Sequence, residues 1–191
     1  MRPLHSCLAE IKNCRACEHL QLGPNPVVQA SERAKILIIG QAPGKKVYES
    51  GIPFNDASGD RLRSWLGVSR EHFYDPNQFA IMPMGFCYPG KGKSGDLPPS
   101  KLCAPMWHQK VLSMLPNIQL TLLIGQYAQK YYLDEYSSLT ETVQNWRCYL
   151  PRYAVLPHPS PRNQIWLKNN PWFEEDFVSE LRRRTARILS L

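Results

Sequence analysis

The run AKILIIG at residues 34–40 constrains the fold more than any other segment of the chain. It is almost continuously apolar, is rich in isoleucine and ends at a glycine. A strand that is apolar at nearly every position is buried on both faces, which is typical of a parallel sheet covered by helices on each side. Weaker runs of the same kind predict three further strands, at 79–82, 120–125 and 153–156.

Helix-like segments alternate with these predicted strands. They lie around residues 8–11 and at 58–68, 99–115, 127–133, 139–150 and 172–189. The alternation predicts an α/β fold, a three-layer α/β/α sandwich around a central, mostly parallel four-stranded sheet. Because the chain has 191 residues and 43% apolar content, we expect residues 1–191 to form a single domain.

The chain carries a formal net charge of +7. Such an excess of Lys and Arg favours a polyanionic partner, because each neutralised phosphate releases a counterion. The apolar runs are far shorter than the roughly 20 residues that span a bilayer, and the N-terminal segment lacks the apolar stretch of a secretory signal. We therefore expect a nucleic-acid-binding monomer without a membrane span, located in a reducing bacterial cytosol close to the nucleoid.

The unusual segments of the chain follow the ends of predicted strands. They are GQAPG (40–44), PMGFCYPGKGKSGD (83–96), GQY (125–127) and PHPSPRN (157–163). In open parallel sheets, ligands bind outside the carboxyl ends of the strands. We therefore expect these segments to meet at one rim of the sheet.

Several residues at this rim have both a structural and a functional interpretation. Gly40 and its GQAPG neighbours allow a tight turn whose N–H groups can face a polar ligand, although such turns are common. Phe54 either covers the core or stacks on a planar ring. Asp56 either begins a helix or orients a water molecule. His158, held between two prolines, is either structural or donates a hydrogen bond to a developing anion.

Six cysteines in a reducing compartment require an explanation other than disulfide bonds. Cys14 and Cys17 form a CxxC pair, and Cys87 and Cys103 flank a proline-containing stretch. Four such thiolates can hold zinc or an iron–sulfur cluster, or the cysteines can be buried and unligated. The other two cysteines are expected to be ordinary packing residues.

Taken in this order, the segments ILIIGQAPG, GIPF and HPSP, together with the cysteine pattern, resemble the uracil-DNA glycosylase superfamily over nearly the whole chain. The cysteines resemble those of the iron–sulfur glycosylases of families 4 and 5. This implies that Cys14, Cys17, Cys87 and Cys103 ligate a 4Fe-4S cluster, with zinc as the second choice. The HPSPRN segment instead resembles the second motif of the single-strand-selective monofunctional uracil glycosylases.

The resemblance implies a monofunctional DNA glycosylase that removes uracil, or a related deaminated or damaged base, from DNA during base excision repair. It implies that Gly40, Gln41 and Ala42 cradle the base and that Phe54 stacks on it. His158 would stabilise the departing base, and Asp56 would orient the attacking water. The DNA contacts that it implies follow the histidine: Ser160, Pro161, Arg162, Asn163 and Lys168.

Two positions depart from the family pattern. Ala42 stands where the best-known bacterial enzymes carry an aspartate, and Asp56 matches the aspartate that family 5 enzymes use instead. Pro83 replaces the asparagine that reads uracil in family 4, so the sequence leaves the excised base open. The alternatives are a noncatalytic iron–sulfur protein of the same fold that binds nucleic acid, and a zinc-stabilised hydrolase of small nucleotides.

Overall fold

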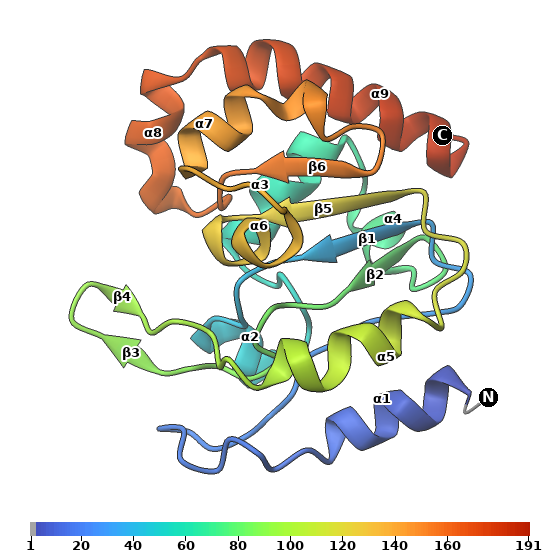
Figure 1. The fold of residues 1–191 in the computed structure, drawn as a ribbon, viewed down its shortest axis with the longest axis vertical. Helices are drawn as coiled ribbons and strands as arrows, with labels where there is room; N and C mark the ends of the chain where they lie inside the picture. The colour runs from blue at the N-terminus through green and yellow to red at the C-terminus, as the bar shows by residue number, and fades with distance from the viewer. Residues whose placement is uncertain (1–2) are drawn as a thin grey trace.

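A four-stranded parallel sheet forms the centre of the computed structural model, which describes residues 3–191 (Figure 1). Its strands run in the order β2-β1-β5-β6, and each neighbouring pair is parallel. The bounds are β1 (Ile36–Ile39), β2 (Phe79–Ile81), β5 (Leu120–Ile124) and β6 (Tyr153–Leu156). All residues of the two central strands, β1 and β5, are buried, as expected for strands covered on both faces. The four strands predicted from the apolar runs are confirmed.

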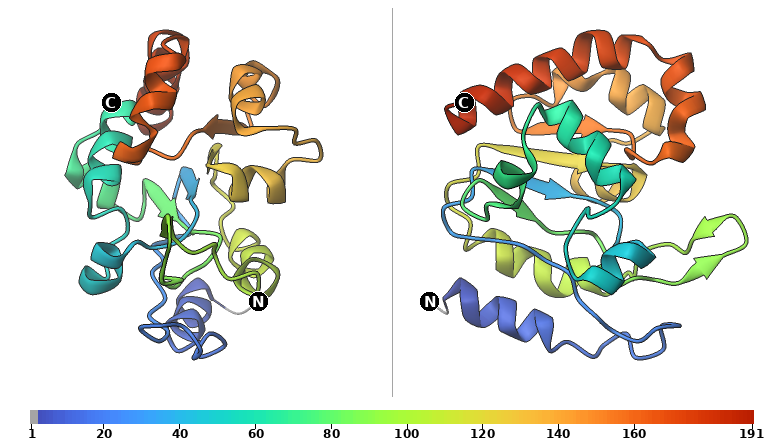
Figure 2. Two further views of the ribbon diagram at one scale, coloured as in Figure 1. Left: turned by 90° about the vertical axis from the view of Figure 1, so that its left-hand side faces the viewer. Right: turned by 180° about the vertical axis from the view of Figure 1, so that it is seen from behind.

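Helices cover both faces of the sheet (Figures 1 and 2). On one side lie α5 (Gln109–Leu112), α6 (Gln126–Tyr132) and α7 (Leu139–Gln144), and on the other lie α3 (Ala57–Leu66), α4 (Arg70–Tyr74) and α9 (Val178–Leu189). A further helix, α1 (Leu4–Lys12), packs against α5. This arrangement is the predicted three-layer α/β/α sandwich. Among residues 3–191, no helix has the length and apolar composition needed to cross a membrane.

Three predicted helices have different bounds in the structure. The segment predicted at 99–115 becomes helical only near Cys103, with a π-helical stretch at Ala104–His108 that leads into α5. Pro105 explains part of this irregularity, because it has no N–H to donate within a helix. The closing helix also begins with a π-helical stretch, at Phe173–Phe177. The segment predicted at 139–150 forms α7, which ends at Gln144, and then a separate 3-10 turn at Trp146–Cys148.

Several short elements were not predicted from the sequence. They are α2 (Lys45–Ser50), α4, the antiparallel hairpin of β3 (Lys91–Gly92) and β4 (Gly95–Asp96), the 3-10 turn Pro161–Asn163, and α8 (Gln164–Asn169). Elements this short contain too few turns or alternations to produce a periodic apolar signal. The hairpin extends beyond the carboxyl edge of the central sheet, beside the segments that follow β1 and β6 (Figure 1).

Candidate active site

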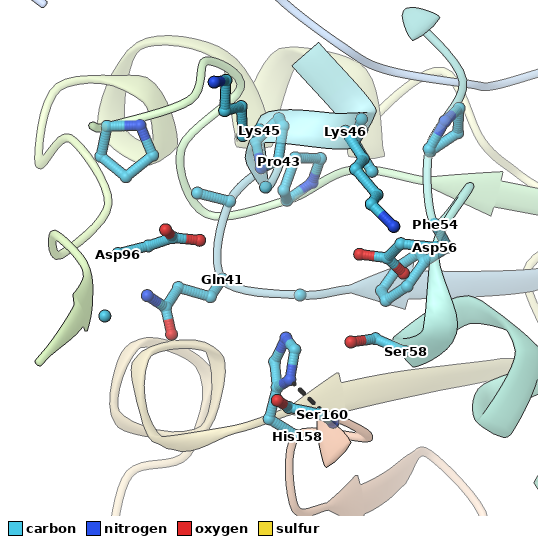
Figure 3. A pocket seen from close by; sticks show the side chains of 18 of the residues that line it. Gln41, Pro43, Lys45, Lys46, Phe54, Asp56, Ser58, Asp96, His158 and Ser160 are labelled. Carbon is cyan, nitrogen blue, oxygen red and sulfur yellow. Dashed lines mark hydrogen bonds between the residues drawn. The ribbon is translucent and has the colours of Figure 1, made fainter. Parts of the chain in front are cut away.

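A cavity of about 470 Å³ opens at the carboxyl edge of the sheet (Figure 3). It is lined by the turn after β1, the segment before α3, the β3–β4 hairpin and the segment after β6. Three of the four segments expected at this rim therefore contribute to the cavity, whereas no residue of GQY (125–127) is among its lining residues. The predicted site residues that line it are Gly40, Gln41, Ala42, Phe54, Asp56, His158, Ser160, Arg162 and Asn163. The other two predicted DNA contacts, Pro161 and Lys168, are not among the lining residues.

His158 points its imidazole ring into this cavity (Figure 3). The backbone N–H of Ser160 donates to Nδ1 of the ring over 3.2 Å. Because Nδ1 accepts this hydrogen bond, the neutral ring carries its proton on Nε2. His158 therefore presents an N–H donor to whatever occupies the cavity.

Polar contacts hold the loop that carries His158. Nδ2 of Asn163 donates to the carbonyl of His158 over 2.7 Å. Arg61, on α3, donates through Nη1 to the carbonyl of Ser160 over 3.1 Å. The loop is thus fixed before any ligand arrives, which is the condition under which a hydrogen-bond donor stabilises a transition state most effectively.

The charge state of His158 follows from its surroundings. Burial lowers the pKa of His158 below its usual value, and the negative charges of Asp56 and Asp96 partly oppose this shift. Figure 3 shows the two carboxylates on opposite sides of the imidazole. At neutral pH the ring is therefore uncharged, and it donates a hydrogen bond without carrying a positive charge into the cavity.

Phe54 reaches the cavity from an unusual backbone conformation. Its φ of 53° lies in the left-handed region, which is uncommon for residues other than glycine. A Cβ added to Gly40 would lie 3.3 Å from the Cζ atom of the Phe54 ring, so the ring packs closely over this glycine. The ring also meets Phe73 edge-on, with centroids 6.2 Å apart. Phe54 therefore contacts the core and lines the cavity at the same time.

Asp56 combines the two roles considered for it. Its Oδ1 accepts a hydrogen bond from the backbone N–H of Gly59 over 2.9 Å, so Asp56 is the N-cap of α3. Its Oδ2 lies 3.9 Å from the position that a Cβ on Gly44 would occupy, and the residue lines the cavity. One carboxylate oxygen thus caps the N-terminus of α3, while the other is placed to accept a hydrogen bond from a ligand or water.

The structure adds cavity residues that were not singled out from the sequence. Asp96, in β4, accepts a hydrogen bond from the hydroxyl of Tyr88 over 3.4 Å, and its Oδ2 lies 3.8 Å from the same point above Gly44. Lys45 and Lys46, at the start of α2, also line the cavity. Segment 83–96 was expected at this rim, but a short polar hairpin has no pattern that shows which side chains face inward.

Pro83 lines the cavity, and its carbonyl is hydrogen-bonded to His108, which does not line the cavity. Nε2 of the buried His108 donates to this carbonyl over 3.0 Å. Nδ1 of the same ring accepts from the hydroxyl of Tyr132 over 2.6 Å. Burial lowers the pKa of His108 from 6.5 to about 4, so the ring is neutral at physiological pH.

The lowered pKa of His108 predicts that stability depends on pH. Below pH 6.5 the unfolded chain takes up a proton that the folded protein does not accept, so the free energy of unfolding falls until the folded pKa near 4 is reached. We expect this group to contribute a loss of about 3 kcal/mol between pH 7 and pH 4. Urea denaturation at a series of pH values measures the loss.

The variant His108→Gln should show a smaller fall in the free energy of unfolding over the same pH range than the wild type. His5→Gln serves as the control, because His5 is exposed on α1. A pH dependence that is identical in the wild type and in His108→Gln would show that His108 is not the group responsible for the loss of stability.

The thiols of the four predicted cysteine ligands are close enough to interact electrostatically. The pKa of the Cys87 thiol is raised to about 12, mainly by burial and in smaller part by charge repulsion from Cys103, Cys17 and Cys14. Ser100 contributes its hydroxyl, which accepts a hydrogen bond from Sγ of Cys17 over 3.2 Å and also bonds with Cys103. In residues 3–191, however, no three His, Cys, Asp or Glu side chains are arranged closely enough to hold a metal ion. The cysteines do not line the cavity.

Comparisons with known proteins identify the family of the chain. Three curated type-4 uracil-DNA glycosylases are similar to this chain. The one from Saccharolobus solfataricus is 26% identical over 88% of this chain and 80% of its own length. The one from Sulfurisphaera tokodaii is 25% identical over 93% and 83%, and the one from Archaeoglobus fulgidus is 27% identical over 70% and 65%. A family model described as the uracil DNA glycosylase superfamily matches residues 27–182, which include every residue that lines the cavity. The chain therefore belongs to the uracil DNA glycosylase superfamily.

Proposed function

We propose that this protein is a monofunctional DNA glycosylase that hydrolyses the N-glycosidic bond of uracil, or of a related deaminated or damaged base, in DNA. The observation that supports this most directly is the Nε2–H of His158 in the same cavity as Phe54 and Asp56. Three similar proteins are named type-4 uracil-DNA glycosylases. In this proposal the chain acts in base excision repair as a single-domain monomer in the bacterial cytosol.

The first step is capture of the target base outside the DNA helix. An enzyme that acts on a base must take it out of the stack, at a cost of a few kcal/mol. The ring of Phe54 offers a face on which the base stacks, a contact typically worth about 1 to 3 kcal/mol. The backbone of Gly40, Gln41 and Ala42 lines the cavity and receives the polar edge of the base.

The second step is departure of the base. As the bond between C1′ of the sugar and the base nitrogen breaks, its electron pair moves onto the base, and negative charge collects on a neighbouring carbonyl oxygen. The neutral imidazole of His158 donates its Nε2–H to that oxygen. A fixed donor of this kind is worth about 3 to 4 kcal/mol of transition-state stabilisation.

The third step is hydrolysis. Oδ2 of Asp56 accepts a hydrogen bond from a water molecule and orients its oxygen toward C1′. The water oxygen bonds to C1′, and its proton passes through the carboxylate to the departed base anion. The products are the free base and an abasic sugar. Because water is the nucleophile, no lysine forms a covalent bond with the DNA in this mechanism.

We propose that the segment after His158 and the neighbouring basic residues bind the DNA backbone. Lys168 is exposed on α8, outside the cavity, where it is accessible to a phosphate. Arg162 donates through Nη1 to the carbonyl of Ser94 over 3.4 Å, so part of its role is to hold the hairpin beside the cavity mouth. Ser160, Pro161 and Asn163 complete the proposed contact segment. Binding through these residues should weaken steeply with added salt.

We also propose that Cys14, Cys17, Cys87 and Cys103 hold a 4Fe-4S cluster. The donor set suits such a cluster, because four thiols from three segments of the chain interact electrostatically, and a cationic centre would offset the repulsion between the thiolates. When bound, such a cluster cross-links the segment after α1 to the segments after β2 and before α5. Zinc is the alternative ion for the same thiolates.

Replacing Cys87 by serine tests the cluster. We expect Cys87→Ser to lose most of its iron and its visible absorbance, and to melt at a lower temperature than the wild type, because a ligand that cross-links distant segments is removed. Metal analysis and absorbance spectra of the purified proteins measure this. Cys148→Ser is the matched control, since Cys148 is exposed. A colourless wild-type protein that contains stoichiometric zinc would remove the cluster from the proposal.

The decisive test of the proposed function is a base-excision assay. Oligonucleotides containing uracil, hypoxanthine or hydroxymethyluracil, both single- and double-stranded, are incubated with the protein, and abasic sites are then cleaved with alkali. We expect release of uracil, together with a slower rate in Asp56→Asn. Binding of DNA without release of any base would favour the noncatalytic alternative.

A further inference from the structure

We infer that Arg63 and Tyr74 are positioning residues, which hold the backbone of Pro53 and Phe54 so that the Phe54 ring faces the cavity. Both lie outside the cavity lining, on α3 and α4. The inference rests on the proposed function, because it assigns the two residues an effect on base capture that acts through Phe54.

The contacts form one linked network. Nη1 of Arg63 donates to the carbonyl of Phe54 over 3.3 Å and to the hydroxyl of Tyr74 over 3.2 Å. The hydroxyl of Tyr74 in turn donates to the carbonyl of Pro53 over 2.9 Å. Two successive carbonyls of the turn are therefore held by a single pair of side chains.

The turn needs such support. Phe54 has a φ of 53°, a conformation that a bulky residue adopts only when its surroundings enforce it. The same carbonyl that accepts from Arg63 also packs directly on Gly59, where an added Cβ would lie 1.7 Å from it. Both contacts to this carbonyl come from residues that do not line the cavity, and they hold the backbone from which the ring projects.

The position of Arg63 is unusual for a charged residue. Arg63 is only 6% exposed, and its helix neighbours Leu62 and Leu66 are buried in the core. Burying a guanidinium is unfavourable unless its donors are satisfied. Here Asp60 accepts from Nη2 over 2.6 Å, and the guanidinium carbon lies 5.2 Å from the centre of the Phe73 ring. The other terminal nitrogen, Nη1, donates to the Phe54 carbonyl of the turn and to the hydroxyl of Tyr74.

A double-mutant cycle separates positioning from general stability. We expect Tyr74→Phe to lower kcat/KM for excision about fivefold, the effect of losing one hydrogen bond, and Arg63→Met to lower it about thirtyfold. In a Phe54→Ala background, neither change should lower kcat/KM further, because the ring on which they act is absent. Arg63→Lys should recover part of the loss. Arg182→Met is the control, since Arg182 also donates to a carbonyl of α3, that of Ser64, but outside the cavity.

Hydrogen–deuterium exchange supplies a readout that does not need activity. We expect Tyr74→Phe to speed exchange of the amides in segment 53–56, while Arg182→Met leaves that segment unchanged. Effects of Tyr74→Phe or Arg63→Met that persist in full in the Phe54→Ala background would overturn the inference and leave the glycosylase proposal intact. If the wild type releases no base, the proposed function fails, and unchanged exchange in Tyr74→Phe would then overturn the inference separately.

Discussion

Replacing His158 by alanine is expected to slow base release by about a thousandfold, the upper end of the effect of removing one preorganised donor. The reason is the tautomer that the structure indicates: Nδ1 accepts from the N–H of Ser160, so the neutral ring directs Nε2–H into the cavity. Alanine leaves the developing charge on the base without this donor. Single-turnover rates with a uracil-containing oligonucleotide measure the loss, and DNA affinity should change far less than the rate.

Two further variants test whether the loss of activity comes from the Nε2–H donor of His158. His158→Gln keeps a side-chain N–H and should lose less activity than His158→Ala. His5→Ala, on the exposed surface of α1, should behave like the wild type. A His158→Ala protein that is folded and releases uracil at the wild-type rate would show that another group stabilises the leaving base.

The parallel sheet could be predicted from the sequence because its strands are buried on both faces. A strand such as β1 is apolar at every position, which no exposed segment tolerates. The β3–β4 hairpin left no such signal, because contacts with distant residues hold it in place. Arg162 donates to the carbonyl of Ser94. This contact exists only once the loop after β6 has folded beside the hairpin.

The location of the site could also be predicted, because parallel strands bring their carboxyl ends to one edge. This rule placed GQAPG and HPSPRN together, and both line the cavity. The network around Arg63 could not be predicted in the same way. The sequence does not show which group an arginine on an apolar helix face will contact. Arg63 contacts the carbonyl of Phe54, a residue whose backbone is in the left-handed region. The backbone conformation of a single residue is set by packing that sequence patterns do not record.

Replacing Gly59 by alanine is expected to lower the free energy of unfolding by about 3 kcal/mol, the upper end of the usual cost of overpacking. The Cβ of the new alanine would lie 1.7 Å from the carbonyl oxygen of Phe54 and 2.9 Å from the Cβ of Phe54, so the backbone of the turn must move. That carbonyl also accepts from Arg63. Because the shift displaces the Phe54 ring and the Asp56 cap together, kcat/KM should fall about a hundredfold. Urea denaturation and the excision assay measure the two effects.

Gly51→Ala is the matched control for this prediction. Gly51 lies in the same stretch of chain, has a φ of 68°, and an added Cβ there would meet nothing within 4 Å. Alanine at this position should therefore cost only the left-handed backbone strain, about 1 to 2 kcal/mol. Its kcat/KM should remain close to that of the wild type, since no cavity residue needs to move. If Gly59→Ala were as stable and as active as Gly51→Ala, the close packing of Gly59 on the Phe54 carbonyl would not be what holds the stacking ring in place.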